Sequence, residues 1–447
     1  MTETRFIVQL TNALAGDQRN PPQKIAQSLL SVDIARQLAS LQFSEMLPLL
    51  EQMPIGQKAE VFGHLPVHLQ VELANAMPRT QRVALVSAMA ADERADLFNR
   101  FDALQKEALL PALAHLERED LRRLSSYREG TAGSLMTSEY STLDAGLTAA
   151  QSLEVLRREA MDAETIYQTY VLDNQRRLLG TVSLRELVLA QPHALVSELM
   201  TRQVISARVD TCREEVARLI SEYDLLALPV VNPEGVLVGI VTCDDAMDVV
   251  VEEATEDFHK GAMISTPIGN LRDATIGLLY RKRVLWLVLL VFGNLFSGAG
   301  IAAFEDVIAA NIALVFFLPL LVDSGGNAGS QSATLMVRAL ATGEVILKDW
   351  MRLLTRECGV ALALGVTMAI AVAGLGIMRG GMDIAVIVAT SMVLIVVLGS
   401  LIGMSLPFLL SRLRMDPAVA SGPLITSIAD AAGVLVYFGI ATQVLEL

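Results

Sequence analysis

The sequence of 447 residues predicts a multidomain protein: an all-α helical-repeat N-terminal domain, a tandem α/β pair and a five-span α-helical membrane domain. Three observations carry this prediction. Apolar stretches long enough to cross a bilayer occur only after residue 283. Hydrophobic residues recur every twelve positions near the N-terminus, and a second repeat of about 60 residues follows them. At this length and with a hydrophobic content of 53%, the chain is too long for one domain and too apolar to be wholly soluble.

Charge is concentrated in the first part of the chain. Residues 1–283 hold 28 of the 35 Lys and Arg residues and 39 of the 49 Asp and Glu residues, a net charge of −11. No secretory signal opens the chain, and Cys212, Cys243 and Cys358 lack the spacing of a disulfide framework. We therefore expect this part to stay in the cytoplasm with reduced thiols.

A twelve-residue period marks the N-terminal domain, residues 1–130. Pro54, Pro66 and Pro78 each follow a periodic residue directly, and proline is tolerated in the first turn of a helix. The period therefore predicts a solenoid of short helices, each under about nine residues, with an irregular helical bundle as the alternative. The periodic residues are Leu41, Met53, Leu65, Met77, Met89, Phe101 and Leu113.

A second repeat spans residues 131–253. "LMTSEYSTL" at residue 135 returns as "LMTRQVISA" at 199, and "GTVSLRELV" at 180 returns as "GIVTCDDAM" at 239. In each copy a helical pattern precedes a β-branched strand, and a further strand and helix follow. The repeat therefore predicts two similar α/β units side by side, at 131–198 and 199–253.

An acidic segment joins the soluble part to the first apolar stretch. "DDAMDVVVEEATEDFHK" places seven acidic residues within fourteen positions, and at helical spacing Asp245, Asp248, Glu252 and Glu256 share one face. Like charges at this spacing destabilise a helix unless something neutralises them. We expect an acidic connecting helix over 254–283 that binds cations, with a merely solvated acidic face as the alternative.

Five predicted membrane spans fill residues 284–447. Three stretches are uncharged and exceed the roughly 20 residues that a spanning helix needs, and two more are interrupted only by Asp323 and Asp430. Basic residues gather on one side of these stretches, with only Arg379 on the other, which predicts a cytoplasmic N-terminus and a C-terminus outside. The spans are 284–304, 307–337, 358–378, 384–411 and 417–445.

Asp430 lies at the middle of the last apolar stretch. A carboxylate at the bilayer centre costs about 2.5–3.5 kcal/mol to insert, and no Lys or Arg lies in the predicted spans to pair with it. Asp323 lies in "FFLPLLVDSGGNAGSQ", where we expect Pro319 and the glycines to break the helix beside a cavity. Oxygen ligands without histidine or thiol favour a hard cation such as Mg²⁺. A protonated, hydrogen-bonded Asp430 is the alternative.

The stretches "PLLVDSGGNAGSQ" and "DPAVASGPLITSIADAAG", with the five spans, closely resemble the MgtE-type magnesium channels and transporters. The resemblance covers the whole chain, because the soluble part is similar to that family's helical domain and its pair of CBS (cystathionine beta-synthase-type) domains. It implies a homodimer with an ion path along the two-fold axis, where two copies of Asp430 hold a largely hydrated Mg²⁺. The pore positions that it implies are Asp430, the backbone oxygens of Thr426 and Gly433, Asp416 and Asn327.

The resemblance also implies regulation by cytosolic Mg²⁺. Bound Mg²⁺ would bridge the acidic faces and hold the path closed, and low Mg²⁺ would let the faces repel and open it. In the second CBS copy, Thr242 and Asp245 match the usual spacing for adenine-nucleotide contacts, so we expect ATP as a regulatory ligand, with a purely structural strand-to-helix turn as the alternative. The implied regulatory metal positions are Glu60, Asp92, Asp96, Glu214, Asp224, Asp245, Asp248, Glu253, Glu256 and Asp257.

The sequence therefore predicts a Mg²⁺ channel or transporter of the cytoplasmic (inner) membrane, and not an enzyme. The five histidines form no HExxH motif and no Walker A sequence is present. Transport of a broader set of divalent cations, such as Co²⁺ and Mn²⁺, is the first alternative. A CBS-regulated transporter of another solute and a non-transporting magnesium sensor are weaker ones, because an unpaired carboxylate at midspan repels anions and the spans are interrupted.

Overall fold

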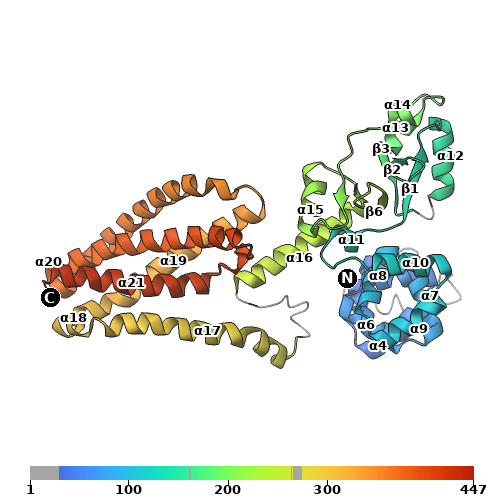
Figure 1. Ribbon diagram of the computed structural model, residues 1–447. Helices are drawn as coiled ribbons and strands as arrows, with labels where there is room; N and C mark the ends of the chain where they lie inside the picture. The colour runs from blue at the N-terminus through green and yellow to red at the C-terminus, as the bar shows by residue number, and fades with distance from the viewer. Residues whose placement is uncertain (1–29, 161–162, 263, 265–273, 447) are drawn as a thin grey trace, which may run out of the picture. The chain divides into compact units, whose positions relative to one another are not determined.

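The computed structural model describes residues 30–160, 163–262, 264 and 274–446 (Figure 1). The chain divides into two compact units, Met1–Val250 and Val251–Leu447, which are described here one at a time. Residues 1–29 of the predicted helical domain, and 263 and 265–273 of the predicted connecting segment, lie outside the described residues.

The first unit begins with a series of short helices joined by short connections. The periodic residues Met53, Leu65, Met77, Met89 and Phe101 are buried between them, as a repeating stack requires. The helices are α3 (Ser31–Leu38), α4 (Phe43–Glu51), α5 (Ile55–Gly63), α6 (Val67–Ala76), α7 (Arg79–Ala88), α8 (Ala91–Arg100), α9 (Ala103–Leu109), the 3-10 helix η1 (Leu110–Ala112) and α10 (His115–Leu124).

The three prolines of the repeat lie at helix N-caps. Pro54, Pro66 and Pro78 directly precede helices of 9, 10 and 10 residues, so the helices are slightly longer than the sequence predicted. A proline at this position fixes the extended backbone that enters the helix and removes no hydrogen bond from it. The repeating proline therefore sets where each helix of the stack begins.

The two α/β units contain three-stranded sheets of the same topology. In each sheet the first two strands pair in parallel, across a helix, and the last two pair antiparallel. The strands are β1 (Tyr140–Asp144), β2 (Thr165–Leu172) and β3 (Leu178–Ser183), then β4 (Ala207–Arg208), β5 (Ala227–Val231) and β6 (Leu237–Thr242). The helices are α11 (Ala132–Leu135), α12 (Ala149–Glu159), α13 (Leu184–Leu189), α14 (Val196–Leu199), α15 (Arg213–Glu222) and α16 (Cys243–Gly261).

One hydrophobic core runs from the N-terminal helices into the second α/β unit. It includes Phe98 of α8, Met136 after α11 and Val216 of α15. The first α/β unit has a separate core, and a small cluster around Tyr170 and Ile240 joins the two sheets. The helical domain and the second α/β unit are therefore packed on one another through shared apolar surface.

Long apolar helices form the second unit and run alongside one another (Figure 1). They are α17 (Ile276–Ala302), α18 (Glu305–Ala310), α19 (Ala313–Ala341), the 3-10 helix η2 (Leu347–Asp349), α20 (Trp350–Arg412), the 3-10 helix η3 (Pro417–Val419) and α21 (Gly422–Val444). Among the described residues, three helical stretches are long and apolar enough to cross a membrane: Ile276–Ala302, Leu347–Arg412 and Gly422–Val444. The predicted count of five spans is not confirmed by this criterion.

The backbone at Gly381 bears on that count. Gly381 has φ 80° and ψ −167°, so its backbone is not helical and α20 consists of two helices that meet there. Such a φ favours glycine, because other residues are strained in this region.

The connecting helix differs from the predicted 254–283, because α16 begins at Cys243, directly after β6, and α17 has already begun at Ile276.

The predicted helix break around Asp323 is wrong, since α19 continues as a helix through Pro319 and the following glycines. The glycines instead allow close helix packing. A Cβ on Gly326 would lie 2.5 Å from Thr426 Cγ2 of α21, and one on Gly329 would lie 2.6 Å from the carbonyl oxygen of Gly399 in α20. Small residues let membrane helices approach in this way, which explains a glycine-rich segment without a break.

Candidate functional site

Helices α19 and α21 bring the two midspan carboxylates near each other. Asp430 on α21 is half-buried and Asp323 on α19 is exposed, and the charges of the two groups interact. Nδ2 of Asn327 donates a hydrogen bond of 2.9 Å to Oδ2 of Asp323, one helical turn away. The contact of Gly326 with Thr426 sets the close approach of the two helices. One side of this helix pair therefore presents carboxylate and amide oxygens.

Thr426 and Gly433 flank Asp430 within the unbroken helix α21. Oγ1 of Thr426 donates to the carbonyl oxygen of Gly422 at 2.8 Å, and Gly433 is buried between α19 and α20. Because a backbone carbonyl has two lone pairs, one that accepts a helical hydrogen bond keeps a second for a ligand. The predicted backbone ligands at these two positions are compatible with a continuous helix.

Neither α19 nor α21 supplies a basic residue near Asp323 and Asp430. Helix α21 contains no Lys or Arg, and Arg338 in the last turn is the single basic residue of α19. A carboxylate at membrane depth without a basic partner needs water or a bound cation to be stable. Carboxylate, amide and carbonyl oxygens are ligands that suit Mg²⁺ or Ca²⁺.

Asp416, a predicted pore position, is occupied by a protein cation. Nζ of Lys260, near the end of α16, lies 2.5 Å from Oδ2 of Asp416 and 2.8 Å from Oε1 of Glu256. Burial lowers the pKa of the Lys260 ammonium, but its hydrogen bonds to Asp416 and Glu256 outweigh burial and raise that pKa above its ordinary value. Two predicted metal ligands are thus brought together, with an ammonium group between them.

A second acidic site lies in the first unit, between the helical domain and the α/β pair. Asp92 and Glu93 lie in the first turn of α8, Asp245 lies in the first turn of α16, and Glu164 lies directly before β2. Burial raises the pKa of Asp92 to about 7, with further contributions from Glu164 and Asp96. These four residues are called the acidic cluster below.

The pKa values of the other members of the acidic cluster are also raised. Burial, together with the charge of Asp92, raises the pKa of Glu93 to about 8 and that of Asp245 to about 7. Burial and the charge of Asp245 raise the pKa of Glu164. Carboxylates that disfavour one another's ionisation form a region of negative potential, to which a divalent cation is attracted.

One oxygen of the acidic cluster is buried without a partner. Oδ1 of Asp92 is enclosed and accepts no hydrogen bond from the described residues. An enclosed acceptor of this kind needs an explanation, such as a water molecule or an ion. In the described ranges, however, no three His, Cys, Asp or Glu side chains are already placed so that they could hold a metal ion. Binding a cation there therefore requires side-chain rearrangement.

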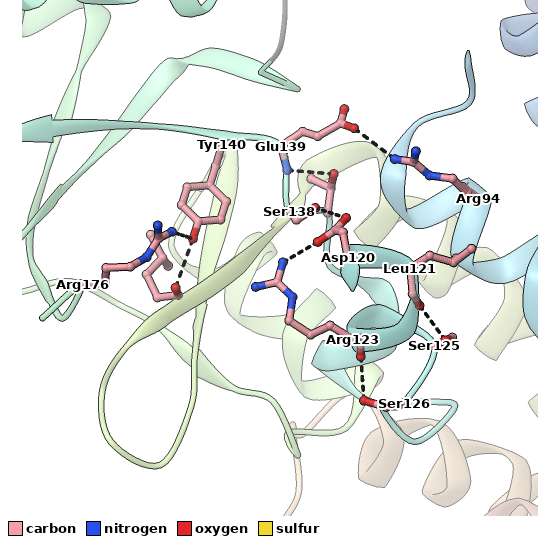
Figure 2. A network of polar contacts seen from close by, with 12 residues as sticks. Arg94, Asp120, Leu121, Arg123, Ser125, Ser126, Ser138, Glu139, Tyr140 and Arg176 are labelled. Carbon is pink, nitrogen blue, oxygen red and sulfur yellow. Dashed lines mark hydrogen bonds and ion pairs between the residues drawn. The ribbon is translucent and has the colours of Figure 1, made fainter. Parts of the chain in front are cut away.

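A polar network beside the acidic cluster holds helices α8 and α10 to the first α/β unit (Figure 2). The buried Arg94 of α8 pairs with Glu139 at 3.6 Å, and Oγ of Ser138 donates to Asp120 of α10 at 2.7 Å. Arg94 follows Asp92 and Glu93 directly in the sequence. The network therefore fixes the helix turn that carries two members of the acidic cluster.

The remaining predicted metal residues are more dispersed. Oε2 of Glu60 accepts a hydrogen bond of 2.8 Å from Ser31, and Asp224 is exposed at a backbone position with φ 51°. Glu214, Asp248 and Asp96 are exposed, and Asp96 acts on the acidic cluster through its charge. Glu253, Glu256 and Asp257 are partly buried on α16.

Sequence reasoning missed Glu93, Glu164 and Lys260. Glu93 is adjacent to Asp92, and neighbours on a helix point in different directions, so only the packing of α8 shows that both join the cluster. Glu164 and Lys260 act with residues far away in the sequence. The one feature of the sequence that could have suggested Glu164 is its position directly before strand β2.

The predicted nucleotide contacts lie together at the end of β6. Oγ1 of Thr242 donates to Oδ2 of Asp245 at 2.5 Å, and Thr242 is buried. In the first copy, Ser183 donates to Glu186 at 2.8 Å in the same place. Asp245 therefore belongs both to the predicted nucleotide position and to the acidic cluster.

Comparison with known proteins identifies similar chains over most of the length. Residues 318–440 match a family described as MgtE, divalent cation transporter; residues 29–130 match the MgtE intracellular N domain and 196–252 match a CBS domain. The magnesium transporter MgtE of Thermus thermophilus is 45% identical over 329 residues, which is 74% of this chain and 73% of that protein. The magnesium transporter MgtE of Bacillus subtilis is 39% identical, over 73% and 72%.

Two solved structures resemble the soluble part. The cytosolic domain of the Mg²⁺ channel MgtE in complex with ATP is 37% identical with a TM-score of 0.51, covering 54% of this chain and 99% of that chain. The soluble part of a magnesium transporter is 29% identical with a TM-score of 0.53, covering 57% of this chain and all of that chain.

Proposed function

Because the chain belongs to the MgtE family of divalent cation transporters, we propose that it is a Mg²⁺ channel or transporter that cytosolic Mg²⁺ closes. The relatives' names describe magnesium transporters, which are not enzymes. The observation that carries the proposal is Asp430 on α21 beside Asp323 and Asn327 on α19, on a helix face without a basic residue.

The proposed path uses two copies of the chain. One midspan carboxylate per chain is a weak site for a divalent cation, whereas a two-fold axis would bring two copies of Asp430 together. Because Mg²⁺ gives up its water reluctantly, the two carboxylates would hold a largely hydrated ion through its waters. The homodimer and its axial ion path are therefore part of this proposal.

Five membrane spans are proposed: α17, α19, the two helices of α20 that meet at Gly381, and α21. Helix α19 is 29 residues long, which is enough to cross the hydrocarbon core despite Asp323. With basic residues on the cytoplasmic side, five spans in the inner membrane place the N-terminus inside and the C-terminus outside.

For closure by cytosolic Mg²⁺, the acidic cluster is the proposed sensor within the first unit. Its carboxylates are raised in pKa by burial and mutual repulsion, so the compact arrangement is strained when they are ionised. A divalent cation would remove that strain and stabilise the compact state over an open one. The other predicted metal residues on α16 would extend the same response toward the membrane.

ATP is proposed as a regulatory ligand of the second CBS copy. The hydroxyl of Thr242 and the carboxylate of Asp245 face each other at the start of α16, and a solved relative of the soluble part carries ATP. Because Asp245 also belongs to the acidic cluster, nucleotide and cation binding would influence each other through one side chain.

The test is Mg²⁺ flux into liposomes that contain the full chain. Uptake should occur at low Mg²⁺ in the compartment facing the soluble domains and should stop as that concentration rises. Absence of uptake from a folded, correctly oriented protein would overturn the transport proposal. If Co²⁺ or Mn²⁺ competes with Mg²⁺ and is itself transported at a similar rate, the result would favour the broader divalent cation transporter.

A further inference from the structure

A cavity of about 620 Å³ lies beside α20, and none of the proposed pore residues lines it. Its wall is formed by the last turns of α20, with Ile402, Leu406 and Leu409, and by Ile428 of α21. This volume is in the range of small-molecule and lipid-chain pockets. All of its lining residues belong to the second unit.

Two basic side chains line this cavity. Lys348 of η2 and Arg412, the last residue of α20, both line it and are exposed. Neither forms an ion pair or hydrogen bond within the described ranges. The neighbouring Asp349 does not line the cavity, and its Oδ2 accepts a hydrogen bond of 3.0 Å from the backbone nitrogen of Ile346. The cavity lining therefore contains two basic side chains and no acidic one.

The places of these two basic residues in the chain match a membrane surface. Both basic residues flank apolar helices on the side where basic residues of the chain collect, which is the cytoplasmic side in the proposed orientation. Trp350 lines the cavity next to them, and tryptophan is enriched at the level of lipid headgroups. A cavity lined by apolar side chains, one tryptophan and two basic side chains matches the apolar chains and charged headgroup of one anionic phospholipid.

We propose that this cavity binds an anionic phospholipid of the cytoplasmic leaflet, with the phosphate between Lys348 and Arg412 and an acyl chain along Leu406 and Ile428. A negatively charged headgroup supplies the missing counter-ion, and the acyl chain covers apolar surface that is otherwise open. The lipid would also tie η2 to the end of α20 and to α21, the helix that carries Asp430. The proposal uses the membrane orientation given above but not the transport activity.

Fluorescence quenching tests this site directly in the full chain. The chain has two tryptophans, Trp286 and Trp350, so Trp286→Phe leaves Trp350 as the reporter. The protein is placed in phosphatidylcholine bilayers with increasing fractions of either phosphatidylglycerol or phosphatidylcholine carrying brominated acyl chains. Brominated phosphatidylglycerol should quench Trp350 at a clearly lower mole fraction. Equal quenching by the two lipids would overturn the proposal.

A double variant identifies the headgroup contacts. In Lys348→Ala/Arg412→Ala, the mole fraction of phosphatidylglycerol at half-maximal quenching should rise by about fivefold for each basic side chain removed. Arg352→Ala/Arg356→Ala is the matched control, because both residues lie on α20 outside the cavity, and it should keep the preference. Equal loss of preference in both variants would show general surface attraction and overturn a specific site.

Two further outcomes are decisive. Glycerol 3-phosphate in the buffer should not change the quenching curve, and its competition with the lipid would show that the site takes a soluble phosphate instead. If neither brominated lipid quenches Trp350, and cysteines introduced at Leu406 in two copies of the chain cross-link, a second copy of the chain fills the cavity. These measurements do not depend on Mg²⁺ flux, so a failure here is distinguishable from a failure of the transport proposal.

Discussion

Nζ of Lys260 lies 2.5 Å from Oδ2 of Asp416, although 156 residues separate the two in the sequence. The same ammonium contacts Glu256 one helical turn earlier at 2.8 Å. Lys260 is thus a tethered cation held between two carboxylates, both of them predicted metal ligands. The contact also joins the end of α16 to the segment that leads into α21, the helix that carries Asp430.

Replacing Lys260 should make closure more sensitive to Mg²⁺. In Lys260→Met, Asp416 and Glu256 lose their internal cation, so a divalent ion no longer competes with the ammonium. For a partly exposed pair worth about 1 kcal/mol, the Mg²⁺ concentration at half-closure should fall roughly fivefold. Flux into liposomes at graded Mg²⁺ measures this midpoint. Lys260→Arg keeps the charge and is the control; an unchanged midpoint in Lys260→Met would contradict competition at this place.

The acidic cluster should make the stability of the soluble unit depend on pH. The pKa values of Asp92, Glu93 and Asp245 are raised to about 7, 8 and 7, so the folded state retains protons that the unfolded state has released. In metal-free buffer the free energy of unfolding should therefore fall as the pH rises from about 4 to about 8, by on the order of 1 kcal/mol per pH unit for each of the three groups. Urea unfolding at several pH values measures it.

Added Mg²⁺ and a substitution in the acidic cluster distinguish this pH dependence of stability from the titration of other groups. Saturating Mg²⁺ should flatten the pH dependence, because the cation stabilises the ionised carboxylates. Asp92→Asn should reduce the slope in metal-free buffer. Glu159→Gln, at an exposed position in the first α/β unit that makes no hydrogen bond or ion pair with the described residues, should leave it unchanged. Stability that rises with pH in the absence of metal would contradict the assigned pKa directions.

Asp430→Asn should abolish Mg²⁺ uptake while the soluble part still binds Mg²⁺. The amide has nearly the same shape but no charge, and a loss of 1.4 kcal/mol in ion stabilisation already reduces affinity about tenfold. Isotope or dye flux reports uptake, and calorimetry on the purified chain reports binding by the soluble part. Asp383→Asn removes an exposed carboxylate of the same unit and should transport normally. Normal uptake by a folded Asp430→Asn protein would refute the proposed path.

Gly326→Ala should destabilise the membrane unit by pushing α19 away from α21. Its Cβ would lie 2.5 Å from Thr426 Cγ2, so the helices must shift, at a cost of about 1–3 kcal/mol. A Cβ on Gly374 of α20 would meet nothing within 4 Å, so Gly374→Ala should be neutral or add about 0.5–1 kcal/mol. Thermal unfolding in detergent compares the two. Equal melting temperatures would show that the close approach is not required.

Thr242→Ala should weaken ATP binding to the soluble part. The hydroxyl that positions Asp245 is removed, and a hydrogen bond to a charged group contributes about 1.5–3 kcal/mol, which corresponds to tenfold or more in affinity. Titration calorimetry with ATP measures the change. The equivalent change in the first copy, Ser183→Ala, is the matched control and should have a small effect. A larger loss in Ser183→Ala would move the site to the first copy.

Much of the architecture was predictable from local patterns. The twelve-residue period predicted the short helices, because each proline marks a helix start, and the repeat of 131–253 predicted two sheets of equal topology. The expected break at Pro319 was wrong, because the glycines after it serve close contacts with α20 and α21 that lie far along the chain. Whether a glycine breaks a helix or packs against another one depends on its neighbours in space.

The sequence by itself determined the family, the order of the domains and the single acidic residue of the last apolar helix, since these follow from periodicity, composition and motifs along the chain. Only the tertiary structure decided that Glu93 and Glu164 join Asp92 and Asp245, and that Lys260 lies against Asp416. The physical reason is that the interaction of two charges depends on their separation and burial, which the packing of distant segments sets.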